Sequence, residues 1–477
     1  MKRKHFLIPL IILAALYISI MTLVACNNTT TPADTTADTI LTEEVTDMAT
    51  ETPTEPMTDA EVITEAPTEA PTEAPTEAET QPVGEITSDF KAMWLSQFDL
   101  QTIYSQGTAG QRDEANYRTR IAQVMQNVAK NGFNTVILQM RPYADSFYPS
   151  EYYPASRFVV GSYGNEFKYD AMAIAIEEAH KCGLSVHAWI NPLRGMTTTE
   201  IASVSDEYLI KQWYAAEKVA DRNTKVVTVN SNVYLNPAYD DVRQLIIDGA
   251  IEIIKKYDVD GLHMDDYFYP TTDASFDAKA YAAYKKTTNT PMSLADWRRD
   301  NLNKLISGIY SAMKAEDPSA VFGISPAGDF NKVQNTHFAD VVTWCSTEGY
   351  IDYICPQVYF GFEHQNFAFD KVCQTWQNAI KTDKVKLIIG VTFGKALSQA
   401  DQYAGSGKNE WAEHQDILKR CVEYTGTLER CVGMAVFCYQ YFNDPGTGKE
   451  VAGTATERAN FVSVFKDFTW FKEETEQ

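Results

Sequence analysis

Two adjacent carboxylates, Asp265 and Asp266, stand at the end of a short apolar run and are followed by Tyr267. The run from Gly261 to Met264 has the composition of a buried strand, whereas ionised carboxylates are costly to bury without partners. Acids at the end of such a strand are candidates for chemistry, above all in an α/β barrel, whose active site lies at the carboxyl ends of its strands. The alternative is structural, with Asp266 capping a helix or both acids pairing with nearby Arg or Lys.

The ends of the other predicted strands carry a similar mixture of polar and aromatic side chains. Aromatic faces stack on the apolar faces of sugar rings, while amide and guanidinium groups orient hydroxyls. The mixture predicts a carbohydrate site, whose expected substrate-binding residues are Arg141, His187, Asn191, Arg194, His263, Tyr267, Gln357 and Tyr359. Two alternatives stay open: the histidines could be satisfied core residues, and Arg141 could pair with Asp145 or Glu151.

Hydrolysis of a glycosidic bond needs two carboxyl groups in different protonation states. We expect Asp265 to act as the nucleophile or as the base, because it shares the direction of His263 along the strand. Asp266 points the other way, so we expect it to orient a neighbour. The proton donor is expected to be Glu363, which follows the sixth strand, or else Asp329, which follows the fifth.

Short apolar runs alternate with segments of helical period from Phe90 onward, which is typical of a parallel β/α fold. Eight such runs over about 390 residues predict an α/β fold, a (β/α)8 TIM barrel with long βα-loop insertions. A doubly wound fold is disfavoured, because no glycine-rich phosphate turn follows the first strand. The predicted strands are Ala92–Phe98, Thr135–Arg141, Ser185–Asn191, Gly261–Asp265, Val321–Pro326, Tyr353–Tyr359, Leu387–Thr392 and Gly433–Tyr439.

Helices are expected between these strands and after the last one. The predicted helices are Tyr117–Asn131, Asp170–Cys182, Asp240–Tyr257, Leu294–Ala315, Lys371–Lys381, Trp411–Tyr424 and Thr456–Phe465. Long insertions follow three of the strands, where loops build the site of a barrel and are usually functional. They are Ala144–Tyr169, Gly195–Leu235 and Pro270–Ser293.

The amino-terminal 89 residues differ from the rest. Residues 1–25 carry three basic residues and an apolar run that closes on Leu23-Val24-Ala25-Cys26, which resembles the lipobox of bacterial lipoproteins. We predict a lipoprotein signal peptide over residues 1–25 and lipidation of Cys26, which would place the chain on the extracytoplasmic face of a bacterial membrane. The alternative is an uncleaved anchor, since the run approaches the ~20 residues that span a bilayer.

Residues 26–89 are rich in Thr, Pro, Glu and Ala and contain no Lys or Arg. With almost no large apolar side chain to bury, this segment is predicted to be a disordered linker. Residues 90–477 are predicted to form the barrel. Of the net charge of −23, residues 90–477 carry −10, which argues against nucleic acid as a partner and fits a weakly charged substrate.

The cysteines and histidines give no indication of a metal or redox centre. Seven cysteines follow Cys26 without any C-x-x-C pair, and most are expected to be buried hydrophobes. Neither H-x-x-x-H nor H-E-x-x-H occurs, so no metal site is predicted. No cofactor is expected.

From about Lys91 to the mid-400s, the chain resembles the glycosyl-hydrolase-like family 10 proteins. The resemblance rests on several motifs in order, among them Ala92-Met93-Trp94-Leu95, Gln139-Met140-Arg141-Pro142, Val186-His187-Ala188-Trp189-Ile190-Asn191-Pro192, Tyr234-Leu235-Asn236-Pro237, Asp260-Gly261-Leu262-His263-Met264-Asp265-Asp266-Tyr267, Gly323-Ile324-Ser325-Pro326 and Asp352-Tyr353-Ile354-Cys355-Pro356-Gln357-Val358-Tyr359. It implies a TIM barrel, an exported and often lipid-anchored glycosidase-like protein, and peptidoglycan glycan strands as the suspected substrate. The strand-four acids of the family map onto Asp265 and Asp266.

The chain departs from the family pattern in one loop. Many members carry Phe-Gly and then an aromatic residue and Arg after the Ser-Pro motif, whereas Ala327-Gly328-Asp329-Phe330 stands here. Any role inferred for this loop is therefore in doubt.

Three hypotheses follow. The leading one is a surface-anchored glycoside hydrolase that cleaves cell-wall or related glycan by paired-carboxylate chemistry. The alternative is a non-catalytic glycan-binding lipoprotein on the same scaffold, which needs the aromatic side chains but not the paired acids. A lipoprotein solute receptor fits the anchor but not the barrel, because such receptors usually have two lobes around a hinge.

Overall fold

The computed structural model describes residues 84–217 and 224–471. The expected signal peptide, the expected lipidation site Cys26 and residues 27–83 of the expected linker lie outside the described residues. Within the described ranges, no helix combines the length and the apolar character that a membrane span requires.

Eight parallel strands close into a barrel in the order β1-β11-β10-β9-β8-β7-β3-β2. They are β1 (Phe90–Leu95), β2 (Thr135–Arg141), β3 (Ser185–Ile190), β7 (Gly261–Met264), β8 (Val321–Ile324), β9 (Tyr353–Ile354), β10 (Lys386–Thr392) and β11 (Cys431–Phe437). Each overlaps one of the eight predicted strands, so the predicted barrel is confirmed. The strands are mostly apolar because a parallel barrel buries both faces of its sheet.

The barrel closes where β1 pairs with β11. Phe90 lies opposite Gly433 in this register, and a Cβ atom at Gly433 would come within 2.0 Å of the Phe90 carbonyl oxygen. A glycine is therefore needed for the first and last strands to pair at this point. The interior between the strands is filled by a separate apolar cluster, which includes Trp94, Ile137 and Tyr353.

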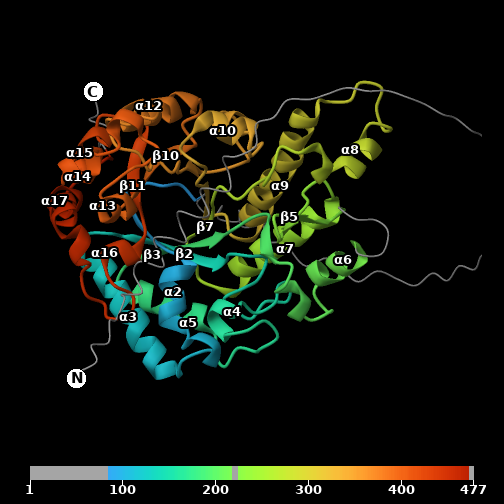
Figure 1. Cartoon of the computed structure of the whole chain (residues 1–477), viewed down its shortest axis with the longest axis horizontal. Coiled ribbons are helices and arrows are strands. Elements are labelled where there is room, and N and C mark those ends of the chain that lie inside the picture. The colour runs from blue at the N-terminus through green and yellow to red at the C-terminus, as the bar shows by residue number, and fades with distance from the viewer. Residues whose placement is uncertain (1–83, 218–223, 472–477) are drawn as a thin grey trace, which may run out of the picture. The chain divides into compact units, whose positions relative to one another are not determined.

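Helices surround the barrel, as Figure 1 shows. The main ones are α3 (Glu114–Lys130), α5 (Ala171–Lys181), α7 (Asp240–Lys256), α9 (Leu294–Glu316), α12 (Phe369–Ala379), α15 (Ile417–Thr425) and α17 (Ala455–Phe465). Helix α7 buries Val242, Leu245, Ile246, Ile253 and Ile254 along one stripe, as an amphipathic helix that covers a barrel should.

One predicted helix is divided in two. The segment predicted as Trp411–Tyr424 forms the short helix α14 (Glu410–Glu413) and then α15. The break is stabilised from outside, because the Glu457 carboxylate of α17 accepts a hydrogen bond from the backbone N of Leu418 over 2.5 Å. A side chain distant in sequence thus caps the second helix, which local periodicity does not reveal.

The loops that follow the strands hold further elements. The helices are α2 (Gln97–Tyr104), α4 (Arg157–Val160), α6 (Leu209–Glu217), α8 (Ala278–Tyr284), α10 (Phe330–Asn335), α11 (Val341–Trp344), α13 (Gly394–Ser398) and α16 (Tyr439–Phe442). Single 3₁₀ turns lie at Gly107–Ala109, Ile201–Ser203, Ala274–Phe276, Gly405–Gly407 and Ala452–Thr454. The insertion after β3 forms an antiparallel sheet in the order β4-β6-β5, made of β4 (Arg194–Thr197), β5 (Val226–Val229) and β6 (Asn232–Leu235).

The insertion after β7 is anchored by a buried ion pair. Arg298 of α9 donates to both oxygens of Asp277 over 2.7 and 2.8 Å, and neither side chain is exposed. The Arg298 guanidinium also lies over the rings of Tyr269 and Phe338, 5.1 and 4.9 Å from their centres. Its charge is therefore matched by a carboxylate and by contact with two aromatic rings, which meet edge to face.

Residues 84–89, expected to belong to the linker, contact the amino-terminal end of the barrel instead. Gly84 N donates to the carbonyl oxygen of Pro318, in the turn before β8, over 2.6 Å. The Asp89 carboxylate accepts hydrogen bonds from the backbone N of Trp470 and Phe471. The folded part of the chain therefore begins before Phe90.

Candidate active site

Asp265 follows the last residue of β7 and is almost fully buried, with 3% of its surface exposed. Both of its oxygens accept hydrogen bonds: the Trp189 indole Nε1 donates to Oδ2 over 3.0 Å, and the backbone N of Tyr267 donates to Oδ1 over 3.2 Å. Trp189 lies on β3 in register with His263 of β7. The pairing of these two strands therefore sets the position of the carboxyl group.

The surroundings of Asp265 favour its protonated form. Burial raises the pKa of this carboxyl group well above its usual 3.8, and the neighbouring Asp266 raises it further. The hydrogen bonds from Tyr267 and Trp189 and the Arg194 cation act in the opposite direction without reversing the shift. Asp266 is less buried than Asp265. A buried carboxyl group with a raised pKa beside a second, less buried one is an arrangement that acid–base catalysis uses.

Arg194, the first residue of β4, lies between two tyrosine rings near Asp265. Its guanidinium carbon is 4.5 Å from the centre of the Tyr143 ring and 4.4 Å from the centre of the Tyr267 ring. The Gln97 amide holds Tyr143 by donating to its hydroxyl over 2.6 Å. Stacking of this kind positions a planar cation without using its N–H groups. Among the described residues, the guanidinium has neither an ion-pair partner nor a hydrogen-bond partner.

Two amide side chains lie at the ends of β2 and β3. The Gln139 amide donates to the Asn191 Oδ1 over 2.9 Å and accepts from the backbone N of Gln97 over 2.7 Å. The Asn191 carbonyl oxygen is thereby occupied, while its amide nitrogen makes no hydrogen bond to another described residue. Asn191 can therefore donate to a ligand hydroxyl.

Aromatic rings from β9 and β11 lie beside the same acids. The Tyr359 and Phe437 rings are stacked with their centres 5.9 Å apart. Burial raises the pKa of the Tyr359 hydroxyl well above its usual value, and Cys355, Asp266 and Asp265 add to the shift. Tyr359 thus lies close to both carboxyl groups.

Gln357 has a structural role at the top of the barrel. Its side-chain amide donates to the Ser325 carbonyl oxygen over 3.0 Å, and its backbone N donates to that of Pro326 over 2.9 Å. Gln357 thereby continues the pairing between β8, β9 and β10 beyond the named strands. Its amide nitrogen is occupied, so its expected contact with substrate finds no support in these hydrogen bonds.

Arg141 does not reach the candidate site, which corrects the expectation that it binds substrate. The pairing of β2 with β3 shifts register between Gln139 and Arg141, which turns Arg141 out of the barrel. Its guanidinium stacks on Tyr153, 4.4 Å from the ring centre, and a Cβ atom at Gly249 of α7 would come within 2.6 Å of it. Asp145 and Glu151, its suggested partners, do not pair with it in the described structure.

His187 and His263 belong to the barrel core, which corrects the expectation that they contact substrate. Trp94 Nε1 donates to His263 Nε2, so His263 Nδ1 carries the proton and bonds the Tyr353 hydroxyl over 2.8 Å. The same hydroxyl lies 2.9 Å from His187 Nδ1. Burial lowers the pKa of His187 to about 3 and that of His263 well below 6.5. Both rings are therefore neutral core groups.

Replacing His187 by Gln is expected to weaken the loss of stability in acid. The pKa of His187 is about 3 in the folded chain against 6.5 for a free histidine, so below pH 6.5 the unfolded chain binds one more proton. The stability that depends on neutral His187 is complete above pH 6.5 and is lost as the pH falls towards 3. Urea unfolding at pH 7, 6, 5 and 4 should show the difference between wild type and variant changing by about 1.4 kcal/mol per pH unit. His414→Gln, at an exposed position, serves as the control, and parallel pH curves for wild type and H187Q would contradict the expectation.

Glu363, expected to be the proton donor, lies in an exposed loop. Its side chain is 53% exposed, and its charged partner among the described residues is His414, 3.8 Å away. Its backbone N is held by the buried Glu410 carboxylate over 2.9 Å. No described contact directs this side chain toward Asp265. The structure therefore does not support Glu363 as the acid.

Asp329, the second candidate, caps a helix. Its Oδ1 accepts hydrogen bonds from the backbone N of Asn331 and Lys332, both over 3.1 Å, at the start of α10. Asp329 is therefore the N-cap residue of this helix, a position at which aspartate is common. The contact assigns Asp329 a structural task in place of the expected catalytic one.

Two residues near the acids were not found from the sequence. His337, between α10 and α11, has a buried Nδ1 without a hydrogen-bond partner among the described residues; burial lowers its pKa, and Asp266 raises it. Tyr234 of β6 lies opposite Arg194 in the small sheet. His337 stands in no motif, whereas Tyr234 belongs to the Tyr-Leu-Asn-Pro motif and could have been singled out.

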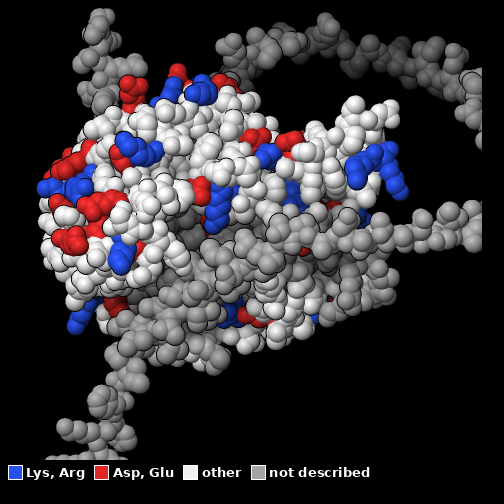
Figure 2. All heavy atoms as spheres, turned by 45° about the horizontal axis from the view of Figure 1, so that its top comes forward, with Lys and Arg blue, Asp and Glu red and all other residues white. Residues whose placement is uncertain are grey.

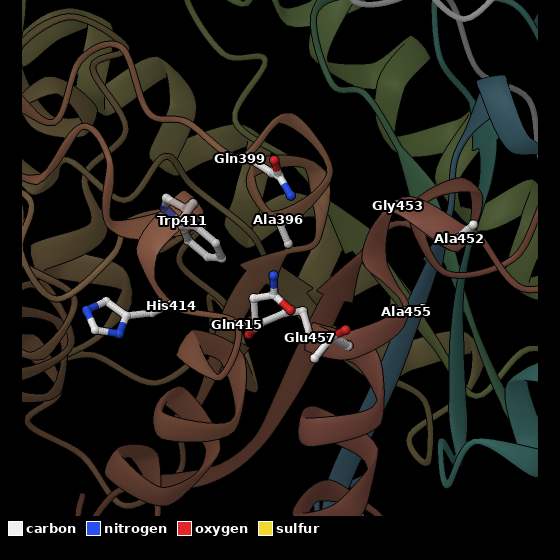
Figure 3. Close-up of a pocket in the computed structure, with 10 residues that line it drawn as sticks. Ala396, Gln399, Trp411, His414, Gln415, Ala452, Gly453, Ala455 and Glu457 are labelled. Atoms are coloured by element: carbon white, nitrogen blue, oxygen red, sulfur yellow. The ribbon is translucent and has the colours of Figure 1, made fainter.

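A cavity of about 210 Å³ lies elsewhere, between the loops that follow β10 and β11 (Figure 3). Figure 3 shows the amides of Gln399 and Gln415 facing each other across it, with Trp411 beside them. Burial raises the pKa of the Glu457 carboxyl group in its wall to about 7. None of the residues around Asp265 lines this cavity, so it is separate from the candidate active site.

No metal centre is found among the described residues, where no three His, Cys, Asp or Glu side chains come together as ligands. The described cysteines are all free, and six of the seven are buried.

Together, these observations define a (β/α)8 barrel with acids and aromatic side chains at the carboxyl ends of its strands. The glycosyl hydrolase-like 10 family model matches residues 89–404, and the chain belongs to this family. Glycosyl hydrolase YngK from Bacillus subtilis strain 168 is 33% identical over 353 residues, which cover 70% of this chain and 64% of that protein. Glycosyl hydrolase DigH from Escherichia coli K12 is 28% identical over 346 residues, which cover 69% of this chain and 77% of that one. The chain thus spans less than two thirds of the length of YngK.

Solved structures share the fold at low sequence identity. The glycoside hydrolase domain of PgaB (BpsB) from Bordetella bronchiseptica superposes with a TM-score of 0.51 at 12% identity, covering 78% of this chain and 98% of that domain. The catalytic domain of beta-amylase from Paenibacillus polymyxa gives a TM-score of 0.50 at 10% identity, covering 80% and 99%. These likenesses support the barrel architecture.

Proposed function

We propose that this protein is a glycoside hydrolase that acts outside the cytoplasm on peptidoglycan or a related glycan, with Asp265 and Asp266 as its reacting carboxyl groups. The observation that carries the proposal is the buried Asp265 carboxyl group, whose pKa is raised by burial and by Asp266. A fold without chemistry at this position has no reason to bury two neighbouring acids at a strand end. The family membership agrees with this activity.

In the proposed reaction, Asp265 is the proton donor rather than the nucleophile or base. Its carboxyl group, whose pKa is raised by burial, passes a proton to the glycosidic oxygen as the bond to the anomeric carbon breaks. Asp266 is less buried and serves as the carboxylate that stabilises the positive charge developing at that carbon. Trp189 fixes the acid through its indole N–H.

The free polar groups around the acids fit a sugar. The Asn191 amide nitrogen and the Arg194 guanidinium have no partners among the described residues and are free to bind hydroxyls. The rings of Tyr267 and Tyr359 provide apolar faces, and Tyr267 is 40% exposed. Figure 2 shows acidic and basic side chains interspersed over the displayed face, a distribution that offers no extended basic surface there for nucleic acid.

The test is incubation of the purified protein with peptidoglycan and a panel of neutral and acidic polysaccharides, with products identified by mass spectrometry. New reducing ends are expected with peptidoglycan or a related glycan. The anomeric form of the first product, read by NMR, shows whether Asp266 attacks the sugar or activates water. Binding of glycan without any turnover would favour the non-catalytic alternative.

We also propose that lipidated Cys26 holds the protein at the outer side of a bacterial membrane. The support is the lipobox-like sequence before Cys26 and the linker that follows it. The protein is expected in the membrane fraction with a diacylglycerol group on Cys26, detectable by mass spectrometry, because lipid chains add membrane affinity. Cys26→Ser should remove the lipid, and a wild-type protein without lipid at this residue would refute the proposal.

A further inference from the structure

We propose that Arg194 makes the candidate active site selective for sugars that carry a carboxylate, and that it binds this group next to the glycosidic bond. The inference rests on the proposed function and names the substrate class of the same site. It starts from a guanidinium that is fixed in position and has no partner for its charge.

The position of Arg194 is set from several directions. Tyr143 and Tyr267 cover the two faces of its guanidinium, at 4.5 and 4.4 Å from the ring centres. Gln97 holds the first ring through its hydroxyl, and the backbone N of Tyr267 is bonded to Asp265. A cation stacked in this way has lost most of its rotational freedom before any ligand binds, so little entropy is lost on binding.

A second arginine of the same chain combines aromatic contacts with a carboxylate, although its two rings meet edge to face and do not cover opposite faces of the guanidinium. Arg298 also lies over two aromatic rings, and its edge donates two hydrogen bonds to the Asp277 carboxylate. Arg194 has the two rings but no carboxylate among the described residues. Arg194 is half-buried. Its guanidinium nitrogens make no hydrogen bond to a described residue and are not enclosed by the protein, so a ligand can reach them. The missing component is an external carboxylate.

The acidic residues around the site explain why an arginine is needed to bind a substrate carboxylate. A substrate carboxylate would lie beside two other acids, Asp265 and Asp266, and a planar guanidinium with five donors is the group best able to hold it there. A neutral sugar needs no such compensation. Arg194 therefore separates acidic from neutral glycans more than it contributes to cleavage of either.

The probe is a pair of glycans that differ only in charge. Peptidoglycan glycan strands with free carboxylates are compared with the same strands after carbodiimide coupling to methylamine, which makes each carboxylate a neutral amide. For the wild type we expect kcat/KM about 10- to 100-fold higher on the acidic strands, mainly through KM, the range for charge-assisted hydrogen bonds. Arg194→Gln should lose this preference, because its kcat/KM should fall about 10- to 100-fold more on the acidic strands than on the neutral ones.

Two further variants make the test specific. Arg194→Lys keeps the charge but not the two-pronged geometry, so an intermediate preference is expected. Arg118→Gln removes a guanidinium from the outer surface, where it pairs with Glu177 and Glu178, and should behave as wild type. Thermal unfolding of each variant checks that the fold is retained.

The outcomes separate this inference from the function on which it rests. Equal wild-type cleavage of both strands would overturn the selectivity and leave the hydrolase in place. An equal loss by Arg194→Gln on both strands would also overturn it, because Arg194 would then act through Asp265. Cleavage of neither strand by the wild type, nor of any glycan in the panel, would remove the proposed function and the inference with it.

Discussion

Replacing Asp265 by Asn is expected to lower kcat on the cleaved glycan by about 10³-fold at pH 7, the usual contribution of a general acid. Asn has the same shape but no proton to give to the leaving oxygen. Glycan binding by D265N should stay near that of the wild type, because the tyrosines and Arg194 are unchanged. Initial rates and a separate binding isotherm on the same glycan measure the two effects.

The same substitution is expected to change stability with pH. The pKa of Asp265 is raised in the folded chain, so its contribution is complete below pH 3.8 and is lost as the pH rises through the folded pKa. Because Asn cannot ionise, the D265N variant does not lose stability in this way as the pH rises. Relative to wild type, D265N should therefore gain stability as the pH rises from 3.8 to the folded pKa, by up to about 1.4 kcal/mol per pH unit, and the difference should stay constant above the folded pKa.

A matched control is Asp258→Asn, in the turn before the same strand, where the side chain is 97% exposed. It should alter neither kcat nor the pH dependence of unfolding. If D265N retained wild-type turnover, Asp265 would not be the acid. If its unfolding curves followed those of wild type at every pH, the carboxyl group would be ionised in the folded chain.

Replacing Gly323 by Ala is expected to destabilise the fold by more than about 4 kcal/mol, the range in which core overpacking disrupts a structure. A Cβ atom at this position would lie 1.9 to 2.3 Å from three atoms of the Tyr353 ring. The ring cannot move without releasing its hydroxyl from the buried side chains of His187 and His263. Urea unfolding and the yield of folded protein measure the effect.

The control for Gly323 is Gly446→Ala, where the nearest atom would be 3.4 Å from the added methyl group. This variant should stay within about 0.5 kcal/mol of wild type, as surface substitutions do. A G323A protein as stable as the control would show that the barrel interior can repack around Tyr353.

The sequence was sufficient to predict the barrel because parallel strands buried on both faces appear as continuous apolar runs. The predicted end of β9 at Tyr359 was too late, since the named strand stops at Ile354 and pairing continues only through Gln357. The small antiparallel sheet after β3 was missed. Its strands have four residues each, too short for period-two alternation to be distinctive.

The site was only partly predictable, for reasons specific to each residue. Asp265 was found because an acid after a buried strand is conspicuous. Arg141 was misplaced because a register shift of β2 turns it outward, and sequence gives no signal for that shift. Glu363 was misjudged because its distance along the chain from β9 does not fix the direction of its side chain. His187 and His263 were assigned to substrate although the core alternative was the correct one.

The stacking of Tyr143 and Tyr267 on Arg194 shows most clearly what the sequence cannot predict. Its rings come from Tyr143, at the end of β2, and Tyr267, after β7, so they meet only when three strands are in register. Pattern analysis marks each residue as polar or aromatic at a strand end but says nothing of their stacking. The open edge of the guanidinium is a property of the assembled fold.

The contacts of Gly84 and Asp89 have a consequence for how the molecule faces its surroundings. The chain enters the barrel beside Pro318, at the end where the strands begin, while Asp265 stands where β7 stops. The residues before Gly84 are thus joined to the end of the barrel opposite to Asp265. If Cys26 is lipidated as proposed, the attachment to a membrane reaches the barrel at the end opposite to the candidate site.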